Sequence, residues 1–298
     1  MADLHNWRGL YPFESHWLDL DGHRYHYVDE GQGEVLLAVH GNPTWSFYWR
    51  NLILGLRDRY RVIAIDHIGC GLSDKPADYP YRMVQHAANL QRLIESLGLE
   101  QITLLAHDWG GAIGLTAALD LPDRFARFVL FNTGAWPPRK IPLPIALCRI
   151  PILGRLGVQG LNLFARPALS MATAHRERMT PAVRAGLLAP YDTWGNRRAT
   201  YQFVQDIPRG PNHPTYAPLA RLVQQAPSLG DRPMQLIWGM KDWCFDAACL
   251  GRLEAMFPDA EAQRLDDAGH YVVEDAWERI VPLVDDFLVR HPLSPGGS

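Results

Sequence analysis

The chain has 298 residues, with 29 Lys and Arg against 32 Asp and Glu, so its formal net charge at pH 7 is −3. This balance excludes a protein that binds nucleic acid through a large excess of positive charge. Hydrophobic residues make up 47% and charged residues 20%, which allows a sizeable core and excludes a disordered chain. The length fits two domains of about 150 residues, or one α/β domain with an insertion.

The cysteines and the apolar runs indicate the cellular compartment of the protein. The four cysteines, Cys70, Cys148, Cys244 and Cys249, form no CxxC pair and no Cys/His cluster with zinc spacing. We therefore expect free buried thiols, with no disulfide framework and no structural metal. The N-terminal segment has no signal-peptide pattern, and no run of about 18 apolar residues occurs. The sequence predicts a cytoplasmic protein without a membrane span.

Short apolar runs alternate with helical patterns in the first half of the chain. Strands are predicted at 23–29, Val35–Val39, Arg61–Ile65, 101–106 and 128–131. A helical period over 83–97 ends at Gly98, which favours a helix end. Runs that are apolar throughout are typical of parallel strands buried on both faces. Strands separated by helices predict a doubly wound α/β sheet.

This rhythm breaks from Trp136 to about His213, where no strand pattern occurs and several short helices are predicted. It resumes with two strands and two helices at 234–238, Ala247–Met256, 262–265 and 276–289. Pro282 predicts a kink in the last helix or a late start to it. The prediction is a core of residues 1–135 and 214–298, with a mostly parallel central sheet, interrupted by an inserted helical cap at 136–213.

The segment 105–111 (LAHDWGG) follows a predicted strand and opens a helix at 112–121. Small residues, Ala106 and Gly110, stand two positions on either side of Asp108. This is the pattern of a nucleophile elbow, a tight strand-to-helix turn that presents one side chain above the sheet. A carboxylate nucleophile needs no activating base and forms an ester at a carbon with a good leaving group. An Asp that merely caps the helix would leave the small flanking residues unexplained.

Three further positions complete this reading. The loop after another predicted strand carries the motif His40-Gly41-Asn42-Pro43. In a nucleophile elbow this loop supplies the second oxyanion donor, so we expect the backbone N–H groups of Asn42 and Trp109 to form the oxyanion site. The alternative is that the loop is only a turn. His270 follows the last strand and fits the base. Asp242 lies 270 − 242 = 28 residues earlier, after the strand 234–238, and fits the orienting acid. Asp246 is its rival, whereas the stretch after the preceding strand, 132–134 (NTG), has no carboxylate.

HGNPTWSFYWRNL, DHIGCGLSDKP, LLAHDWGGAIG and the Asp242/His270 pair resemble the haloalkane dehalogenase group of the α/β-hydrolase superfamily over nearly the whole chain. The resemblance implies that Asp108 is the nucleophile, His270 the base and Asp242 its partner. It also implies that the side chains of Asn42 and Trp109 hold the leaving group, and that no cofactor or metal takes part.

Asp242 together with Asn42 resembles the third dehalogenase subfamily, many of whose members resemble β-lactone decarboxylases of the long-chain olefin pathway. The segments APYDTW, QDIP and WCFD resemble those decarboxylases further. The implied function is decarboxylation of a long-chain cis-β-lactone, a hydrophobic small molecule, to a cis-alkene through an Asp-linked intermediate. Assembly with other olefin-pathway enzymes is also implied. The alternative is hydrolysis of a haloalkane to alcohol and halide.

Two other functions, epoxide hydrolysis and non-catalytic ligand binding, fit the sequence less well. Epoxide hydrolases share HDWGG and use two cap tyrosines, for which Tyr191, Tyr201 and Tyr216 are candidates, but Asn42 replaces the aromatic residue they usually carry. A non-catalytic ligand receptor would have lost a member of the triad. Asp66, at the start of DHIGCG, is interpreted as part of a strand-end turn.

The predicted cap is basic. No Asp or Glu occurs between Arg124 and Arg176, whereas the basic residues there are Arg124, Arg127, Arg139, Lys140, Arg149, Arg155, Arg166 and Arg176. One hypothesis is that this face meets a membrane, an acidic partner or a lipid-like substrate. The alternative is that arginine stems cover apolar cap surface while their charged ends stay in water.

Overall fold

A computed structural model describes residues 6–293 of the chain. Within these residues one eight-stranded sheet runs in the order β1-β2-β4-β3-β5-β6-β7-β8. The strands are β1 His16–Leu20, β2 His23–Glu30, β3 Val35–Val39, β4 Arg61–Ile65, β5 Ile102–Asp108, β6 Phe125–Thr133, β7 Met234–Gly239 and β8 Glu261–Leu265. β2 is antiparallel to both β1 and β4, and every other neighbouring pair is parallel. The predicted α/β fold with a mostly parallel sheet is confirmed.

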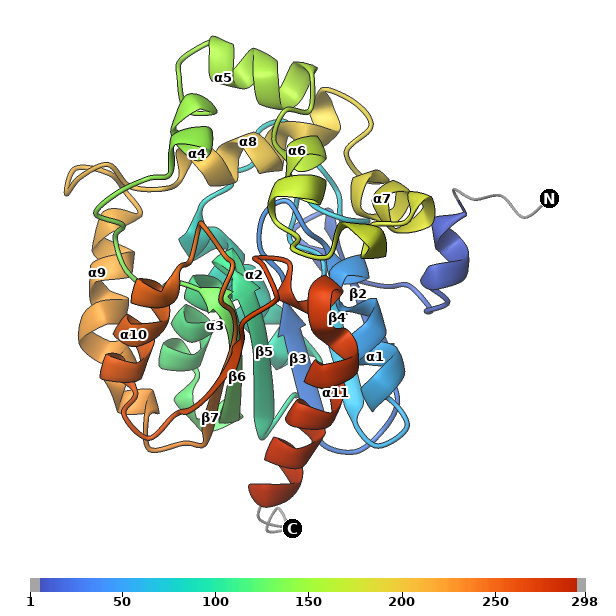
Figure 1. Ribbon diagram of the computed structural model, residues 1–298, viewed down its shortest axis with the longest axis vertical. Coiled ribbons are helices and arrows are strands. Elements are labelled where there is room, and N and C mark those ends of the chain that lie inside the picture. The colour runs from blue at the N-terminus through green and yellow to red at the C-terminus, as the bar shows by residue number, and fades with distance from the viewer. Residues whose placement is uncertain (1–5, 294–298) are drawn as a thin grey trace.

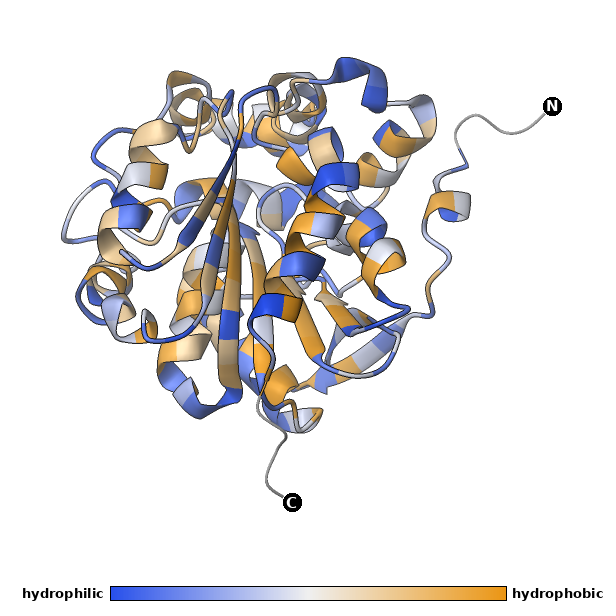
Figure 2. Cartoon of the chain, turned by 60° about the horizontal axis from the view of Figure 1, so that its bottom comes forward, coloured by the Kyte–Doolittle hydropathy of each residue, from blue (hydrophilic) through white to orange (hydrophobic). Residues whose placement is uncertain are grey.

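Helices cover both faces of the sheet (Figure 1). One apolar cluster joins the sheet to α2 Met83–Ser96, α3 Trp109–Asp120, α9 Tyr216–Gln225 and α10 Ala247–Met256. A second cluster joins the opposite face to α1 Arg50–Leu56 and α11 Val272–Arg290. The inner strands β3 to β7 are accordingly apolar along most of their length, whereas the helices carry both hydrophobic and hydrophilic residues (Figure 2). Burial on both faces explains why β3, β5 and β7 lack a two-residue polar alternation.

The chain between β6 and β7 is helical and lies across the carboxyl ends of the parallel strands (Figure 1). Its helices are α4 Leu143–Leu147, α5 Leu153–Arg155, the π-helix η4 Leu156–Gly160, α6 Ala165–Met171, α7 Pro181–Leu188 and α8 Arg198–Gln205. No strand occurs in this stretch. α9 belongs with the helices that flank the sheet because it packs against α3. The exact division into core and cap stays a prediction.

Several element bounds differ from those expected. The sequence missed β1, an edge strand in which exposed and partly buried residues alternate. β6 begins at Phe125 because Arg127, which interrupts the apolar pattern, is itself buried in the strand and bonded to Thr103. α3 begins at Trp109, directly after β5.

α11 starts at Val272, earlier than expected, and continues through Pro282 to Arg290. The break in its backbone falls at Ala276, with φ −147° and ψ 24°, and not at Pro282. The predicted kink or late start at Pro282 is therefore wrong. All four cysteines are free, but only Cys70 is fully buried, and the other three are half-buried. No helix within residues 6–293 is long and apolar enough to cross a membrane.

Candidate active site

Asp108 is the last residue of β5, and α3 begins at the next residue. Its backbone has φ +54° and ψ −126°, a conformation that costs free energy in any residue with a Cβ. The turn is tight because Gly110 packs against β3: a Cβ at Gly110 would lie 2.1 Å from the carbonyl oxygen of Val39. The strand-to-helix turn predicted around Asp108 is therefore present, and only glycine fits at position 110.

The carboxylate of Asp108 is buried beneath the loop that follows β3. The backbone N–H of Asn42 donates to its Oδ1 at 2.7 Å, and a Cβ at Gly41 would lie 2.1 Å from the same oxygen. Burial raises the pKa of Asp108, while His270 and the backbone N–H groups of Asn42 and Trp109 oppose that rise. The two N–H groups expected to form an oxyanion site thus both donate to the carboxylate of Asp108.

His270 stands between two carboxylates. Its Nδ1 lies 2.8 Å from Oδ2 of Asp242, and its Nε2 lies 3.7 Å from Oδ2 of Asp108. Burial lowers the pKa of His270, but the charges of Asp242 and Asp108 and the hydrogen bond to Asp242 outweigh it, so the pKa is raised overall. With Nδ1 bonded to Asp242, Nε2 is the ring nitrogen that faces Asp108. The structure therefore brings Asp108, His270 and Asp242 together.

Asp242 and its rival Asp246 have different surroundings. Asp242 is buried, and its Oδ1 accepts a 2.6 Å hydrogen bond from the backbone N–H of Cys244. Asp246 caps α10 instead, accepting from the backbone N–H groups of Ala248 and Cys249 at 3.0 and 3.2 Å. Of the two, Asp242 is therefore the carboxylate that orients His270.

Sequence analysis missed the contribution of Asn132. Its side-chain amide donates at 3.0 Å to Oδ2 of Asp242 and at 3.0 Å to the carbonyl oxygen of Gly239, and its own oxygen accepts from the N–H of Gly239 at 2.8 Å. Asn132 thus ties the end of β6 to the loop that carries Asp242. The available signal was an amide in a mostly apolar strand, because a buried amide must find partners.

The side chains of Asn42 and Trp109 both contact α8. The amide nitrogen of Asn42 donates to the carbonyl oxygen of Thr200 at 3.2 Å, and its buried Oδ1 has no partner among the described residues. The indole ring of Trp109 lies 5.9 Å from the ring of Phe203, measured between centroids. Both side chains therefore lie where the core meets the helical segment.

Asp66 and Tyr191 make hydrogen bonds to other parts of the structure. The buried carboxylate of Asp66 accepts hydrogen bonds from the backbone N–H groups of Ser46 and Leu72 and from Nδ1 of His26. Burial would raise its pKa, but the charges of His26 and His40 and the hydrogen bonds from His26 and Leu72 lower that pKa to about 2, so Asp66 is a structural anion that holds the turn. The hydroxyl of Tyr191 donates to the carbonyl oxygen of Thr44, which leaves it no proton to offer an epoxide in this arrangement.

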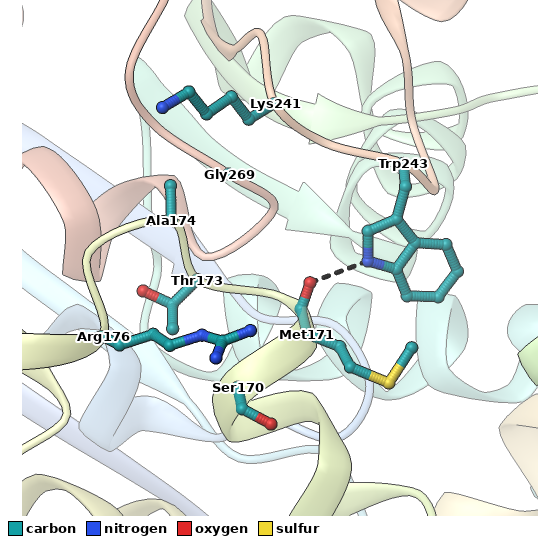
Figure 3. A pocket seen from close by; sticks show the side chains of 8 residues that line it. All are labelled: Ser170, Met171, Thr173, Ala174, Arg176, Lys241, Trp243 and Gly269. Carbon is teal, nitrogen blue, oxygen red and sulfur yellow. Dashed lines mark hydrogen bonds between the residues drawn. The ribbon is translucent and has the colours of Figure 1, made fainter.

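A surface pocket of about 320 Å³ lies beside the loops that carry Asp242 and His270 (Figure 3). Its lining residues are Ser170, Met171, Thr173, Ala174, Arg176, Lys241, Trp243 and Gly269. The indole N–H of Trp243 donates to the carbonyl oxygen of Met171 at 2.8 Å, which ties α6 to the loop after β7 (Figure 3). The pocket touches the chain neighbours of Asp242 and His270 but not Asp108, so it lies outside the candidate site.

Comparison with known proteins gives the class. Residues 34–276 match the family model of the α/β hydrolase fold, and the chain belongs to this family of enzymes. Among solved structures, the haloalkane dehalogenase DatA from Agrobacterium tumefaciens C58 superposes with a TM-score of 0.85 at 25% identity, covering 94% of this chain and 97% of that one. The predicted resemblance to this group is confirmed.

Curated relatives narrow the class. The chain is 44% identical over 280 residues to a cis-3-alkyl-4-alkyloxetan-2-one decarboxylase of Xanthomonas campestris pv. campestris, covering 90% of this chain and 93% of the relative. It is 41% identical over 287 residues to the decarboxylase of that name from Shewanella oneidensis, covering 94% and 90%. Haloalkane dehalogenase 2 of Mycobacterium tuberculosis is 37% identical over 281 residues, covering 92% and 95%.

Proposed function

We propose that this protein decarboxylates a cis-3,4-dialkyl β-lactone to a cis-alkene, with Asp108 as the nucleophile. The observation that carries the proposal is the arrangement of three buried groups: Asp108 on a strained turn, His270 with its Nε2 3.7 Å from that carboxylate, and Asp242 bonded to its Nδ1. The 41% and 44% identities to proteins named as decarboxylases of such lactones support the choice of substrate. The long chain of the substrate is a prediction from the sequence resemblance.

In the first step, an oxygen of Asp108 attacks the ring carbon that bears the ring oxygen. The new carbon–oxygen bond forms as the strained ring bond breaks, and the freed carboxylate leaves as an anion. We assign the side-chain N–H groups of Asn42 and Trp109 to that anion because both side chains lie at the junction of core and helical segment, because the backbone N–H of Asn42 binds Asp108, and because Trp109 follows Asp108 in the chain. Attack at the lactone carbonyl, which would give an anhydride, is the second way to open the ring.

In the second step, the bond to the carboxylate carbon breaks and carbon dioxide leaves. Its electron pair forms the alkene as the ester bond to Asp108 breaks, so Asp108 returns unchanged and no water is consumed. The adjacent His270 has a raised pKa, and in its protonated form it stabilises the negative charge of the departing Asp108 carboxylate. The backbone N–H groups of Asn42 and Trp109 already donate to that carboxylate.

Haloalkane hydrolysis is the second candidate function. The 37% identity to a haloalkane dehalogenase favours it, together with the space between His270 Nε2 and Asp108 Oδ2, which are 3.7 Å apart. In that reaction neutral His270 would take a proton from water, and the water would hydrolyse the Asp108 ester. The same leaving-group donors, Asn42 and Trp109, would hold the halide.

One experiment tests the proposal. The protein is incubated in heavy-oxygen water with a long-chain cis-β-lactone or with a bromoalkane, and the products and the Asp108 peptide are analysed by mass spectrometry. We expect alkene and carbon dioxide from the lactone, without label in Asp108, and label in Asp108 from any slow bromoalkane turnover. A β-hydroxy acid as the sole lactone product, or much faster bromoalkane turnover, would replace the decarboxylase proposal with the dehalogenase one.

The helical segment 136–213 is proposed as the cap of this site, because its helix α8 supplies the contacts to Asn42 and Trp109. A cytoplasmic location and assembly with other olefin-pathway enzymes stay predictions.

A further inference from the structure

Exposed apolar side chains concentrate on one part of the helical segment. Eight of the sixteen large hydrophobic residues that are exposed within the described chain fall between residues 143 and 163. We call them the apolar cap face: Leu143, Leu147, Ile150, Ile152, Leu153, Leu156, Leu161 and Leu163. The most exposed are Ile152 at 74%, Leu143 at 70% and Leu153 at 67%. Large exposed apolar side chains gathered on one part of a surface mark interaction sites, whereas single scattered ones do not.

The position of the apolar cap face suits a flat partner. Helix α5, on which Leu153 lies, is at one end of the long axis of the molecule, opposite the last turn of α11 (Figure 1). No other element projects past it in that view, so a planar surface can reach it. Ile152, just before α5, has φ +63°, which is unfavourable for a β-branched residue. Its side chain points into solvent, so core packing does not repay that strain.

Charge identifies the chemistry of the partner. The structure removes three of the eight basic residues that the sequence assigned to this face: Arg127 is buried against Glu34, Arg149 donates to the carbonyl oxygens of α8 and the residues after it, and Arg124 pairs with Glu100. The sequence hypothesis is corrected to this extent. Arg176 lines the pocket beside Lys241 and Gly269 instead. Four remain within or next to the apolar cap face in the chain: Arg139, Lys140, Arg155 and Arg166.

None of these four cations has a carboxylate within ion-pair distance among residues 6–293. Arg155 instead donates to Gln159 and stacks over the ring of Trp194. No acidic residue occurs between positions 124 and 176 that could neutralise the face from within the segment. The surface therefore combines leucine and isoleucine side chains with unpaired positive charge, the composition of helices that lie in the interface of an anionic bilayer.

We propose that the apolar cap face docks the protein on an anionic lipid bilayer, with the leucine and isoleucine side chains at the level of the acyl chains and the flanking cations at the headgroups. This docking does not depend on which reaction the site performs. It would place the helical segment that covers the site next to the phase in which a hydrophobic substrate dissolves.

Flotation with vesicles tests the proposal. Purified full-length protein is mixed with phosphatidylcholine vesicles, with or without phosphatidylglycerol, at low and high salt. We expect the protein to float with the anionic vesicles at low salt and to be partly released by salt. The double variant I152E/L153E should lose at least about tenfold in binding, because it places two charges in the apolar contact. V289E is the matched control, because Val289 is also exposed but lies near the end of α11, and it should bind like wild type.

A second variant keeps the test independent of folding. R139Q/K140Q changes only charge at two exposed positions and should weaken binding to anionic vesicles several-fold without affecting turnover of a short, water-soluble substrate. Wild-type protein that stays unbound at low salt overturns the proposal, as does equal binding to neutral vesicles. Light scattering that shows self-association lost in I152E/L153E, without vesicle binding by wild type, would assign the face to a second copy of the chain instead.

Discussion

Asn132 donates to Oδ2 of Asp242, the same oxygen that binds Nδ1 of His270. One carboxylate oxygen at the edge of the sheet therefore joins β6 to the base of the proposed mechanism. The orientation of His270 depends on this bond because the amide fixes the rotation of the Asp242 carboxylate. Asn132 is a positioning residue in this scheme, since it touches neither substrate nor reacting atoms.

Asn132→Ala should destabilise the protein and slow the reaction. The change leaves the buried backbone N–H of Gly239 without its side-chain acceptor and removes one donor each from Oδ2 of Asp242 and the carbonyl oxygen of Gly239, which costs about 1–3 kcal/mol of unfolding free energy. Urea denaturation measures this loss, and the pH profile of kcat should shift because Asp242 is less well held. Asn196→Ala, which removes a half-exposed amide bonded to Asp192, is the control and should change neither quantity appreciably. A lower stability with an unchanged pH profile would show that Asn132 is structural only.

Asp108→Gly should be more stable than Asp108→Ala. Both variants lack the carboxylate, so the comparison isolates the backbone at φ +54°, which glycine adopts without a Cβ clash. The expected difference in unfolding free energy is about 1–3 kcal/mol in favour of glycine. This is opposite in sign to the usual effect of the two residues in a helix, where alanine is the more stable. Thermal and urea unfolding check it. Both variants should lack turnover, and more than about a few per cent residual activity would exclude Asp108 as nucleophile.

Asp242→Asn should lower the pKa of His270. Although burial pulls that pKa down, the charges of Asp242 and Asp108 raise it overall, and the substitution removes the larger of the two charge effects. NMR titration of the imidazole should show the fall. A histidine with a raised pKa contributes stability that is complete below its unfolded pKa and lost as pH rises through the folded pKa. Stability of wild type should therefore fall over that window more steeply than stability of Asp242→Asn. Parallel pH curves for the two proteins would contradict the assigned charge pairing.

Trp109→Phe should slow the chemical step. The indole N–H is lost while most of the ring volume against Phe203 is kept. Removal of one donor to a developing anion costs about 2.7–4 kcal/mol, or roughly 10²–10³ in kcat. Steady-state and single-turnover kinetics separate this effect from binding. A rise in KM with kcat unchanged would make Trp109 a packing residue and not a leaving-group donor.

Much of the candidate site could be predicted from local sequence. Asp108 was identified because the residues that shape its turn, Ala106 and Gly110, lie within two positions of it. His270 and Asp242 were identified by their places after predicted strands, and parallel strands bring their carboxyl ends to one edge of the sheet. Each inference needed only short-range pattern and strand order, which is also why the α/β fold was predicted.

Tertiary structure alone decided which polar groups meet across the chain. Asn132 and Asp242 are 110 residues apart, and Asn42 and the Thr200 carbonyl are 158 apart, so no local pattern could pair them. The sequence alone places Arg127 among the surface cations, whereas in the structure its side chain is buried against Glu34. Burial of a polar group is favourable only when a partner satisfies it, and that partner is chosen by packing. The sequence thus determined the turn, the order of site residues and the sheet, and the tertiary structure decided which charges remain on the surface.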